Sequence, residues 1–415
     1  SACLVGSEMC IRDRHDMDYI AASFVQKAED VLAIRKVLEA AGSGMGIISK
    51  IENQAGFTHI DEIIEVSDGV MVARGDLGVE IPAEYVPLVQ KEIIRRCNKA
   101  GKPVITATQM LESMVNSYRA TRAEASDIAN AIFDGTDVIM LSGETASGSY
   151  PLEAVQTMAK IALRTEEALD YAAIFKGKGI SDKIHSTEAI SHATVQIAQE
   201  LDADAIVTVT ESGFTARMIA KYRPKCYVVG VSRIPARVRA MQFYWGVRPL
   251  LGPSSDNTDE MIEISLKCAR EHGYVKDGDS VVITAGVPVG KPGSTNLIKV
   301  VNVGNKLVSG VGIGKRSVTG KICTAVTLTD FKEKFKPGDI LVVGVLPDEA
   351  AAYASKAAAI IAEEGGLTSS VAIIAINCSI PVVVGAENAL NLLKDDMEVT
   401  VDTVSGIVYE GAINI

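Results

Sequence analysis

The first part of the chain, from Met17 to about Tyr171, alternates short apolar runs with charged amphipathic stretches. Runs of strand length separated by helical segments predict βαβ units and a parallel sheet whose strands are buried on both faces. The predicted strands are Tyr19–Phe24, Met45–Ile51, Gly69–Ala73, Pro103–Thr108 and Val138–Leu141. The predicted helices are Ala28–Ala41, Ala83–Ala100, Arg122–Asp134 and Pro151–Ala168.

Most of these strands end in polar residues, in the segments SKIEN, ARGDLG, TATQM and LSGET. The carboxyl ends of parallel strands are where a (β/α)₈ barrel places its active site, but a closed barrel needs eight strands and this pattern gives five. We therefore expect residues 15–172 to be the last five strands of such a barrel. Residues 1–14, SACLVGSEMCIRDR, continue no helix or strand pattern, and we expect them to be a non-native leader.

Two further α/β segments follow a break at Gly177–Ser181. Residues 173–303 form the first, residues 304–317 a Gly/Val-rich linker, and residues 318–415 the second. In the first, the predicted strands are Ala205–Val209, Tyr227–Val231 and Ser280–Thr284, and the helices are Thr187–Glu200, Thr215–Tyr222 and Asp259–His272. In the last, the predicted strands are Asp339–Val345, Ala372–Ile376, Val382–Val384 and Glu398–Asp402, with one helix at Glu349–Glu364.

Composition narrows the class of protein. Apolar residues make up 47% and charged residues 22%, the balance of a folded globular chain rather than a disordered one. The formal net charge of −11, without a basic tract, argues against nucleic acid or an anionic membrane surface as a partner. Seven scattered cysteines without a CxxC pair support neither a disulfide framework nor a structural zinc site, so a reducing cytoplasm fits best.

The segment Ile48–Asn53 holds the sharpest chemical signal. Residues two apart on a strand face the same side, so Lys50 and Glu52 point together beside the following loop. An isolated K-x-E is more often a surface ion pair. At the end of an apolar strand, however, a cation beside a carboxylate suits an anionic substrate and a metal ion.

Two later strand ends extend this picture. In Ala73–Gly78, glycines flank Asp76. Gly75 would let the backbone approach an anion, and Asp76 would add an oxygen ligand for Mg²⁺. A simple β-turn would explain the same residues. Thr108 could contact a substrate or be an ordinary strand threonine. Ser142–Thr145 could support the site or cap the next helix.

In this order, ISKIEN, VARGDLGVEIP, TATQMLESM, RAEASDIANAIFDGTD and MLSGETA resemble the pyruvate kinase family closely. The resemblance covers residues from about Asp16 to Asn302 and implies magnesium- or manganese-dependent phosphoryl transfer from phosphoenolpyruvate to ADP, giving pyruvate and ATP in glycolysis. It implies that Lys50 stabilises the transferring phosphoryl group and that Glu52 and Asp76 hold the metal. It also implies that the backbone at Gly75 and Asp76 binds the substrate carboxylate, and that Thr108 contacts the substrate.

The resemblance has further implications. The family's first three barrel strands and its lid domain have no counterpart here, and they carry the K⁺ ligands and much of the nucleotide site. We therefore expect the chain alone to be nearly inactive, or to aggregate because an open five-stranded sheet exposes apolar edges. The parent protein should be a cytoplasmic homotetramer. A phosphorylated allosteric effector would bind two loops of the second segment; the residues are Thr210, Ser212, Gly213, Thr215, Gly290 and Ser294. Glu211 favours a monophosphate there, because its charge would repel a doubly phosphorylated sugar.

The C-terminal segment resembles the β/β/α swivelling, phosphohistidine-carrying mobile domain of phosphoenolpyruvate-utilising enzymes, through AEEGGLTSS, IPVVVGAENA and EVTVDTVSGIVYEG. Ser370 occupies the position of the carrier histidine, and the five histidines of the chain all lie before residue 273. Serine lacks the imidazole nitrogen of a phosphoramidate carrier. This argues against a phosphotransferase with a histidine carrier; a non-catalytic module that senses a metabolite is the other alternative.

Overall fold

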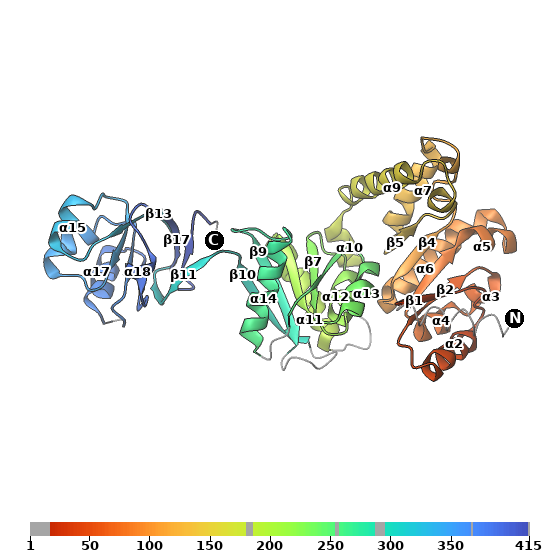
Figure 1. Ribbon diagram of the computed structural model, residues 1–415, viewed down its shortest axis with the longest axis horizontal. Coiled ribbons are helices and arrows are strands. Elements are labelled where there is room, and N and C mark those ends of the chain that lie inside the picture. Colours follow the sequence, from red (N-terminus) through yellow and green to blue (C-terminus); the bar gives the residue numbers. More distant parts are fainter. Residues whose placement is uncertain (1–16, 180–185, 254–256, 287–294, 367, 414–415) are drawn as a thin grey trace. The chain divides into compact units, whose positions relative to one another are not determined.

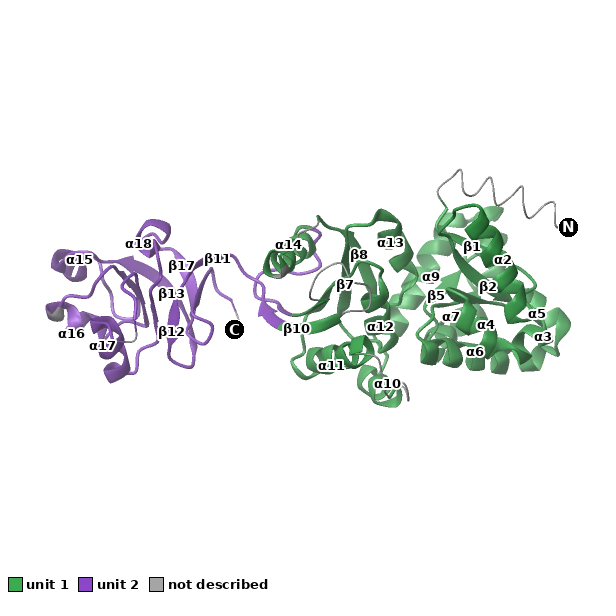
Figure 2. Cartoon of the chain, turned by 90° about the horizontal axis from the view of Figure 1, so that it is seen from below, with its two compact units in different colours: residues 1–271, 282–299 green, residues 272–281, 300–415 purple. Residues whose placement is uncertain are grey.

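The computed structural model describes residues 17–179, 186–253, 257–286, 295–366 and 368–413 (Figure 1). The chain divides into two compact units. One comprises residues 1–271 and 282–299, and the other residues 272–281 and 300–415 (Figure 2). The leader expected over residues 1–14 lies outside the described residues. Among those that are described, no helix is both long and apolar enough to cross a bilayer.

The first sheet has five parallel strands in sequential order, as the alternation of apolar and amphipathic segments predicts. Each strand pairs with the next along the chain, with Ile51 opposite Val72 and Ala73 opposite Ala107. The strands are β1 (Tyr19–Ala22), β2 (Gly46–Ile51), β3 (Gly69–Ala73), β4 (Val104–Ala107) and β5 (Val138–Met140). Its helices are α2 (Ala28–Ala40), α3 (Gln54–Thr58), α4 (Ile60–Val66), α5 (Arg74–Glu80), α6 (Val86–Ala100), α7 (Arg122–Asp134), α8 (Gly143–Ala146), α9 (Pro151–Glu166) and α10 (Tyr171–Gly177), with the short 3₁₀ helices η1 (Ala83–Tyr85) and η2 (Glu112–Val115).

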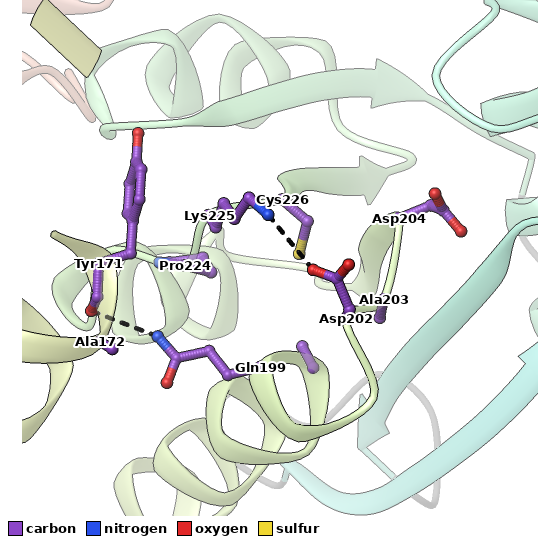
Figure 3. Close-up of a pocket in the computed structure, with 10 residues that line it drawn as sticks. Tyr171, Ala172, Gln199, Asp202, Ala203, Asp204, Pro224, Lys225 and Cys226 are labelled. Carbon is purple, nitrogen blue, oxygen red and sulfur yellow. Dashed lines mark hydrogen bonds and ion pairs between the residues drawn. The ribbon is translucent and has the colours of Figure 1, made fainter. Parts of the chain in front are cut away.

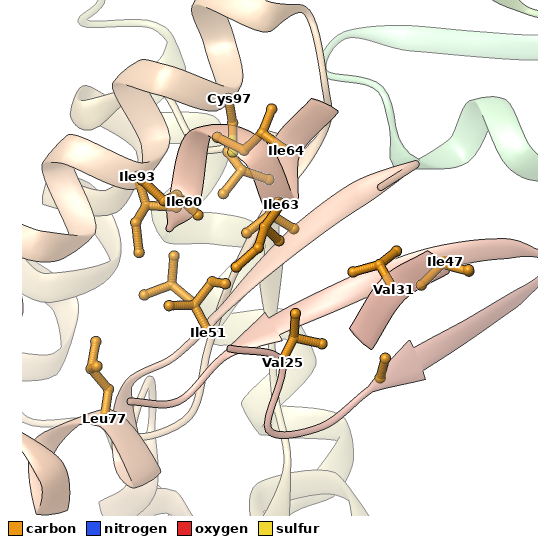
Figure 4. Close-up of a cluster of buried hydrophobic side chains, with 14 of the residues drawn as sticks. Val25, Val31, Ile47, Ile51, Ile60, Ile63, Ile64, Leu77, Ile93 and Cys97 are labelled. Atoms are coloured by element: carbon orange, nitrogen blue, oxygen red, sulfur yellow. The ribbon is translucent and has the colours of Figure 1, made fainter. Parts of the chain in front are cut away.

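One apolar cluster holds this sheet against its helices (Figure 4). Ile47 and Ile51 of β2 are fully buried beside Ile60 and Ile63 of α4 and Ile93 of α6. Each such side chain contributes about 1.5–3 kcal/mol when it is removed from water. The strand ends are therefore carried on a rigid base.

The second sheet has the order β10-β9-β6-β7-β8. Its strands are β6 (Ala205–Val209), β7 (Tyr227–Ser232), β8 (Val247–Leu251), β9 (Ser280–Gly286) and β10 (Thr295–Asn302). Its helices are α11 (Ser186–Glu200), α12 (Phe214–Lys221), α13 (Pro235–Ala240) and α14 (Thr258–Glu271), with η3 (Met241–Phe243). The predicted strands and helices are found, whereas β8, β10 and α13 are additional. A proline begins α13, and another lies within β8.

The third sheet is mixed, with the order β11-β18-β17-β13-β14-β15-β16-β12. Its strands are β11 (Lys306–Ser309), β12 (Val311–Ile313), β13 (Ser317–Thr324), β14 (Ile340–Val343), β15 (Ala359–Ala362), β16 (Val382–Val384), β17 (Glu398–Asp402) and β18 (Ile407–Glu410). The helices are α15 (Leu328–Glu333), α16 (Ala351–Ala354), α17 (Ser370–Cys378) and α18 (Ala389–Leu392), with η4 (Asp348–Ala350). Strands β13 to β16 are parallel neighbours, and β17 and β18 are antiparallel.

Three expectations for this last region are wrong. The helix expected over Glu349–Glu364 is only η4 and α16, because the AIIA run of β15 is buried on both faces between β14 and β16. The strand expected over Ala372–Ile376 lies inside helix α17. There Ser369 caps the helix, and Val371, Ala372 and Ala375 are buried at helical spacing. The linker expected over residues 304–317 contains β11 and β12, which pair with β18 and β16.

Candidate active site

The candidate site lies at the carboxyl ends of three neighbouring strands of the first sheet. Lys50 is in β2, and Glu52 follows it directly; Asp76 belongs to helix α5, which begins at the residue after β3; Thr108 follows β4. Because β2, β3 and β4 are parallel and adjacent, these ends lie on one edge of the sheet, with neighbouring strands about 4.8 Å apart.

Lys50 and Glu52 form an ion pair, with 2.5 Å between Lys50 Nζ and Glu52 Oε1. The Glu52 side chain is 1% exposed and that of Lys50 is 23% exposed. The carboxylate is therefore fixed inside, while the ammonium reaches the surface of the site. This is the shared orientation that the K-x-E spacing predicts.

The loop after β1 supplies two partners that the sequence patterns did not indicate. The backbone N–H of Phe24 donates to Glu52 Oε2 at 2.6 Å, and Lys50 Nζ donates to Ser23 Oγ at 2.9 Å. Phe24 has a φ of 56°, a left-handed conformation that is uncommon for a bulky residue. The positive φ aims this amide at the buried carboxylate, and no sequence signal short of recognising the family marks Ser23-Phe24.

The residues after β3 form the first turn of a helix rather than a β-turn. Helix α5 spans Arg74–Glu80 and places Asp76 in its first turn, where amide groups have no partner within the helix. Asp76 is exposed, and none of the described residues pairs with its carboxylate. Its side chain is thus available to a cation.

Thr108 joins the ends of β3 and β4. The Gly75 N–H donates to Thr108 Oγ1 at 2.8 Å, and that hydroxyl donates to the Ala107 carbonyl at 2.6 Å. Thr108 and Gln109 both have positive φ, 66° and 55°. Two consecutive non-glycine residues in this region cost about 1–3 kcal/mol each, a strain that is found most often at functional sites. The structure therefore brings Gly75 and Thr108 into direct contact.

Arg74 anchors this loop and was not among the residues singled out from the sequence. Its guanidinium donates to the Thr108 carbonyl at 2.7 Å and pairs with Asp127 of α7, also at 2.7 Å. The Arg74 side chain is only 8% exposed. A charged residue directly after a fully apolar strand is the signal that could have found it.

Ser142–Thr145 serves as structural support. The Glu144 carboxylate is 1% exposed and accepts from the amides of Leu111 and Ser142, at 3.0 and 2.7 Å. Both oxygens of Glu144 therefore tie the segment after β4 to the segment after β5, and α8 (Gly143–Ala146) begins there.

The residues expected to bind an effector lie around the start of α12. Gly213, with a φ of 80°, precedes the helix and donates its N–H to Thr210 Oγ1 at 3.0 Å. Ser212 Oγ accepts from the Phe214 amide at 3.3 Å, and Thr215 Oγ1 lies 2.7 Å from Thr295 Oγ1. Gly290 and Ser294 lie outside the described residues.

Glu211 does not carry an unbalanced charge. Its carboxylate accepts from Arg233 Nε at 3.0 Å, so the repulsion invoked against a doubly phosphorylated sugar is largely compensated. The preference for a monophosphate loses its main support.

The donor set at the strand ends suits Mg²⁺. Within the described part of the chain, no three His, Cys, Asp or Glu side chains are grouped to hold a metal ion. Glu52 and Asp76 are two hard carboxylates from adjacent strand ends, and Mg²⁺ takes one or two carboxylates and completes its shell with water and substrate phosphate. The residues present fit this ion.

A parallel α/β sheet with a cation and carboxylates at its strand ends is typical of barrel enzymes. Comparison with protein families gives "Pyruvate kinase, barrel domain" over residues 7–155 and "Pyruvate kinase, alpha/beta domain" over residues 188–301. Residues 335–406 match "PEP-utilising enzyme, mobile domain".

Whole-chain comparison agrees. The chain is 52% identical over 403 residues to a pyruvate kinase of Geobacillus stearothermophilus, covering 97% of this chain and 69% of the relative. It is 52% identical over 400 residues to that of Bacillus licheniformis (96% and 68%) and 50% identical over 403 residues to that of Sporosarcina psychrophila (97% and 69%). The chain belongs to the pyruvate kinase family, the phosphotransferases of glycolysis that use Mg²⁺ and K⁺.

Proposed function

We propose that Lys50, Glu52, Gly75, Asp76 and Thr108 bind phosphoenolpyruvate and the divalent ion for phosphoryl transfer to ADP. The observation that carries this is the Lys50–Glu52 pair, in which a buried carboxylate fixes a surface-reaching ammonium. When charge spreads over the phosphoryl oxygens and the enolate oxygen, a preorganised cation stabilises it without reorganisation.

Gly75, Asp76 and Thr108 hold the other end of the substrate in this proposal. The unpaired amides of the first turn of α5 suit the substrate carboxylate. Since Thr108 Oγ1 now accepts from the Gly75 amide, the carboxylate would replace that hydroxyl, which would turn to donate to substrate. The strained backbone of Thr108 keeps it within reach of the strand ends.

Mg²⁺ or Mn²⁺, bound by Glu52 and Asp76, would supply a Lewis acid that polarises the phosphoryl oxygens. Glu52 contributes through an oxygen already held by its protein partners, whereas the Asp76 carboxylate has none among the described residues. The first is therefore rigid, and the second adapts to the ion.

The remaining proposals concern context. We infer that K⁺ acts in the reaction, that a phosphorylated effector binds at Thr210, Ser212, Gly213 and Thr215, and that the enzyme works in the cytoplasm as a homotetramer. We also propose domain boundaries near residues 172 and 303, which would give each of the first two sheets a domain of its own.

Metal and substrate binding test the site directly. Isothermal titration calorimetry should show Mn²⁺ binding strengthened by phosphoenolpyruvate, and Asp76→Asn should weaken the metal by about tenfold, because one charged ligand becomes neutral. Asp61→Asn, which changes an exposed carboxylate paired with Arg96, is the control. Equal effects of the two variants would contradict the proposal.

We also propose that these 415 residues alone catalyse the complete reaction poorly. The first sheet is an open sheet of five strands, and β1 and β5 each have one neighbour in it. Open edges leave backbone groups unpaired and favour aggregation. If the purified chain had a specific activity near that of the Geobacillus stearothermophilus relative, this proposal would be disproved. The proposal for the binding site would not be affected by that result.

A further inference from the structure

A cavity of about 720 Å³ lies in the first unit at the amino-terminal ends of β1 and β2, opposite the candidate active site. Its other wall comes from helices α12 and α13 of the second sheet. The size is that of a small-metabolite site, for which 300–1,000 Å³ is usual. The side chains that matter most are Tyr19, Arg35, Asp68, Arg217, Arg237 and Tyr244.

The acidic groups of the cavity are already neutralised. Asp68 pairs with Arg35 at 2.7 Å and also accepts from the Ile47 amide at 2.8 Å. Asp18 pairs with Arg239 at 2.6 Å. These contacts leave no carboxylate free to balance further positive charge.

Two arginines of the same cavity have no such partner. Among the described residues, none forms an ion pair or a side-chain hydrogen bond with Arg217 or Arg237. The Nε of Arg217 is buried without a hydrogen-bond partner, and its guanidinium lies 5.2 Å from the Phe214 ring. A buried donor left unsatisfied costs about 1–3 kcal/mol, so the site gains when an anion occupies it.

The neutral side chains complete an amphipathic wall. Burial raises the pKa of both Tyr19 and Tyr244. A phenol hydroxyl is a neutral group that can donate one hydrogen bond to an anion. Ser212 adds a further hydroxyl at the rim. Aromatic faces beside two free guanidinium groups suit a ligand with a charged end and a less polar body.

We propose that this cavity binds a small phosphorylated metabolite, whose phosphate is held by Arg217 and Arg237. Planar guanidinium groups bind phosphate through paired hydrogen bonds, which makes arginine the favoured residue for this task. The site goes beyond the proposed function. It shares only Ser212 with the proposed effector residues, and it lies at the opposite ends of the strands from Lys50.

A second cavity of the same unit shows why the unpaired charge matters (Figure 3). It measures about 410 Å³. Lys225 pairs there with Asp202 at 3.3 Å, and Gln199 donates to the Tyr171 carbonyl, also at 3.3 Å. Burial raises the pKa of the Cys226 thiol to about 12, so it is not a thiolate. The lysine of that cavity is therefore already paired, unlike Arg217 and Arg237.

The test uses inorganic phosphate as the probe and the single tryptophan as the reporter. Trp245 is next to Tyr244 in the chain, so occupation of the cavity should change its fluorescence. We expect a saturable change with phosphate, but not with chloride at equal ionic strength. Arg217→Gln and Arg237→Gln should each raise the half-saturating phosphate concentration by about tenfold, which is the loss of one charge-assisted contact.

Arg248→Gln is the matched control, because Arg248 belongs to the same sheet, stacks on Tyr227 and does not line the cavity. It should shift the half-saturating concentration less than twofold. Phosphate should also raise the melting temperature of the parent chain, but not that of the double variant Arg217→Gln/Arg237→Gln.

Three results would overturn the proposal. The first is no saturable response of the parent chain, and the second is a double variant that binds phosphate as the parent does. The third is a loss on Thr210→Val but not on Arg217→Gln, which would place the phosphate on the loop before α12 instead. Circular dichroism of each variant establishes that it is folded, and none of these variants alters the residues proposed for catalysis.

Discussion

The first and third sheets are alike in their strands and differ at the strand ends. β2 and β3 in one, and β14 and β15 in the other, are short parallel strands with buried apolar side chains. In the first sheet, the strand ends carry a lysine–glutamate pair and a free aspartate. Parallel strands alone therefore do not indicate a site, and the site proposed for the first sheet depends on a fixed cation beside an exposed carboxylate.

Two polar side chains that follow strands of the third sheet contact the backbone of their own domain. Glu363 follows β15 and accepts from the Leu390 amide at 3.0 Å, and no ion pair involves it among the described residues. Ser370 begins α17, and its hydroxyl lies 3.5 Å from the Leu346 carbonyl. Glu363 and Ser370 therefore contact the fold of the mobile domain itself.

Lys50→Met should have the largest effect of the changes considered. The variant leaves the Glu52 carboxylate buried without its cation, which costs about 3 kcal/mol of folding free energy. It also removes the charge proposed to meet the phosphoryl group. Phosphoenolpyruvate affinity, measured by calorimetry with Mg²⁺, should fall by on the order of 100-fold, and any ATP formation should fall at least as much.

Lys50→Arg separates the two contributions, because it keeps the charge beside Glu52 but changes its position. Stability in urea should stay within about 1 kcal/mol of the parent, while substrate affinity still falls. If Lys50→Met bound phosphoenolpyruvate as tightly as the parent does, the proposal that the strand ends of the first sheet bind the substrate through Lys50 would be contradicted.

Arg74→Gln should have the next largest effect. It removes the ion pair with Asp127 and the hydrogen bond to the Thr108 carbonyl, so we expect the free energy of unfolding in urea to fall by about 2 kcal/mol. Displacement of Thr108 should also weaken phosphoenolpyruvate binding several-fold.

Arg95→Gln is the control for Arg74→Gln. Arg95 is exposed and pairs only with Glu92 within α6, so its loss should cost less than about 0.5 kcal/mol and leave substrate affinity unchanged. Similar costs for the two variants would mean that Arg74 does not organise the loop.

The strands and main helices of the first sheet could be predicted from the sequence, because hydrophobic periodicity and segment length determine such elements. β3 and α7 begin and end where predicted, and the spacing of Lys50 and Glu52 placed both side chains together. The backbone conformation of the loops could not be predicted from the sequence. The positive φ of Phe24 and Thr108 depends on contacts with segments 28 and 33 residues away along the chain.

The third domain was harder to predict for a different reason. SVAIIAINC has a uniformly apolar, β-branched composition that is typical of a buried strand, but the cap at Ser369 and burial on one face make it a helix. Likewise, the alanine-rich segment before Glu364 has helical propensity that tertiary burial of β15 overrides. In both segments tertiary burial overrides local preference: α17 is covered on one face and β15 on both.

A second lysine sharpens the contrast between paired and unpaired charge. Lys178, which follows α10, donates to the Lys221 carbonyl at 2.6 Å and to Asn98 at 3.4 Å, and no carboxylate pairs with it among the described residues. Burial, reinforced by Arg223, lowers its pKa from the ordinary 10.5 to about 6. The unfolded chain therefore holds a proton that the folded chain releases, and stability should rise with pH between about 6 and 10.

Lys178→Met should remove that dependence. The free energy of unfolding is measured in urea between about pH 7 and pH 9. The difference in this free energy between parent and variant should change by up to about 1.4 kcal/mol per pH unit. Lys176→Met, at an exposed lysine two residues earlier, should leave the slope as in the parent. A slope that Lys178→Met does not alter would show that Lys178 stays charged when buried.

Ser370→Ala should have the smallest effect on stability and on substrate affinity. Ser369→Ala, at the neighbouring serine, is the comparison that shows a measurable loss of stability. Ser369 Oγ accepts from the Ala372 amide as the N-cap of α17, so Ser369→Ala should cost about 1 kcal/mol. The Ser370 hydroxyl makes only a long contact with a carbonyl, and Ser370→Ala should cost less than about 0.5 kcal/mol and leave phosphoenolpyruvate binding unchanged. The unfolding transition of the mobile domain measures the stability changes, and calorimetry measures binding. A Ser370→Ala variant that loses substrate affinity while remaining folded would contradict this expectation and assign a binding role to the third sheet. A hydroxyl contributes to phosphoryl transfer only when a base activates it, so such a result would also require an activating group elsewhere in the protein.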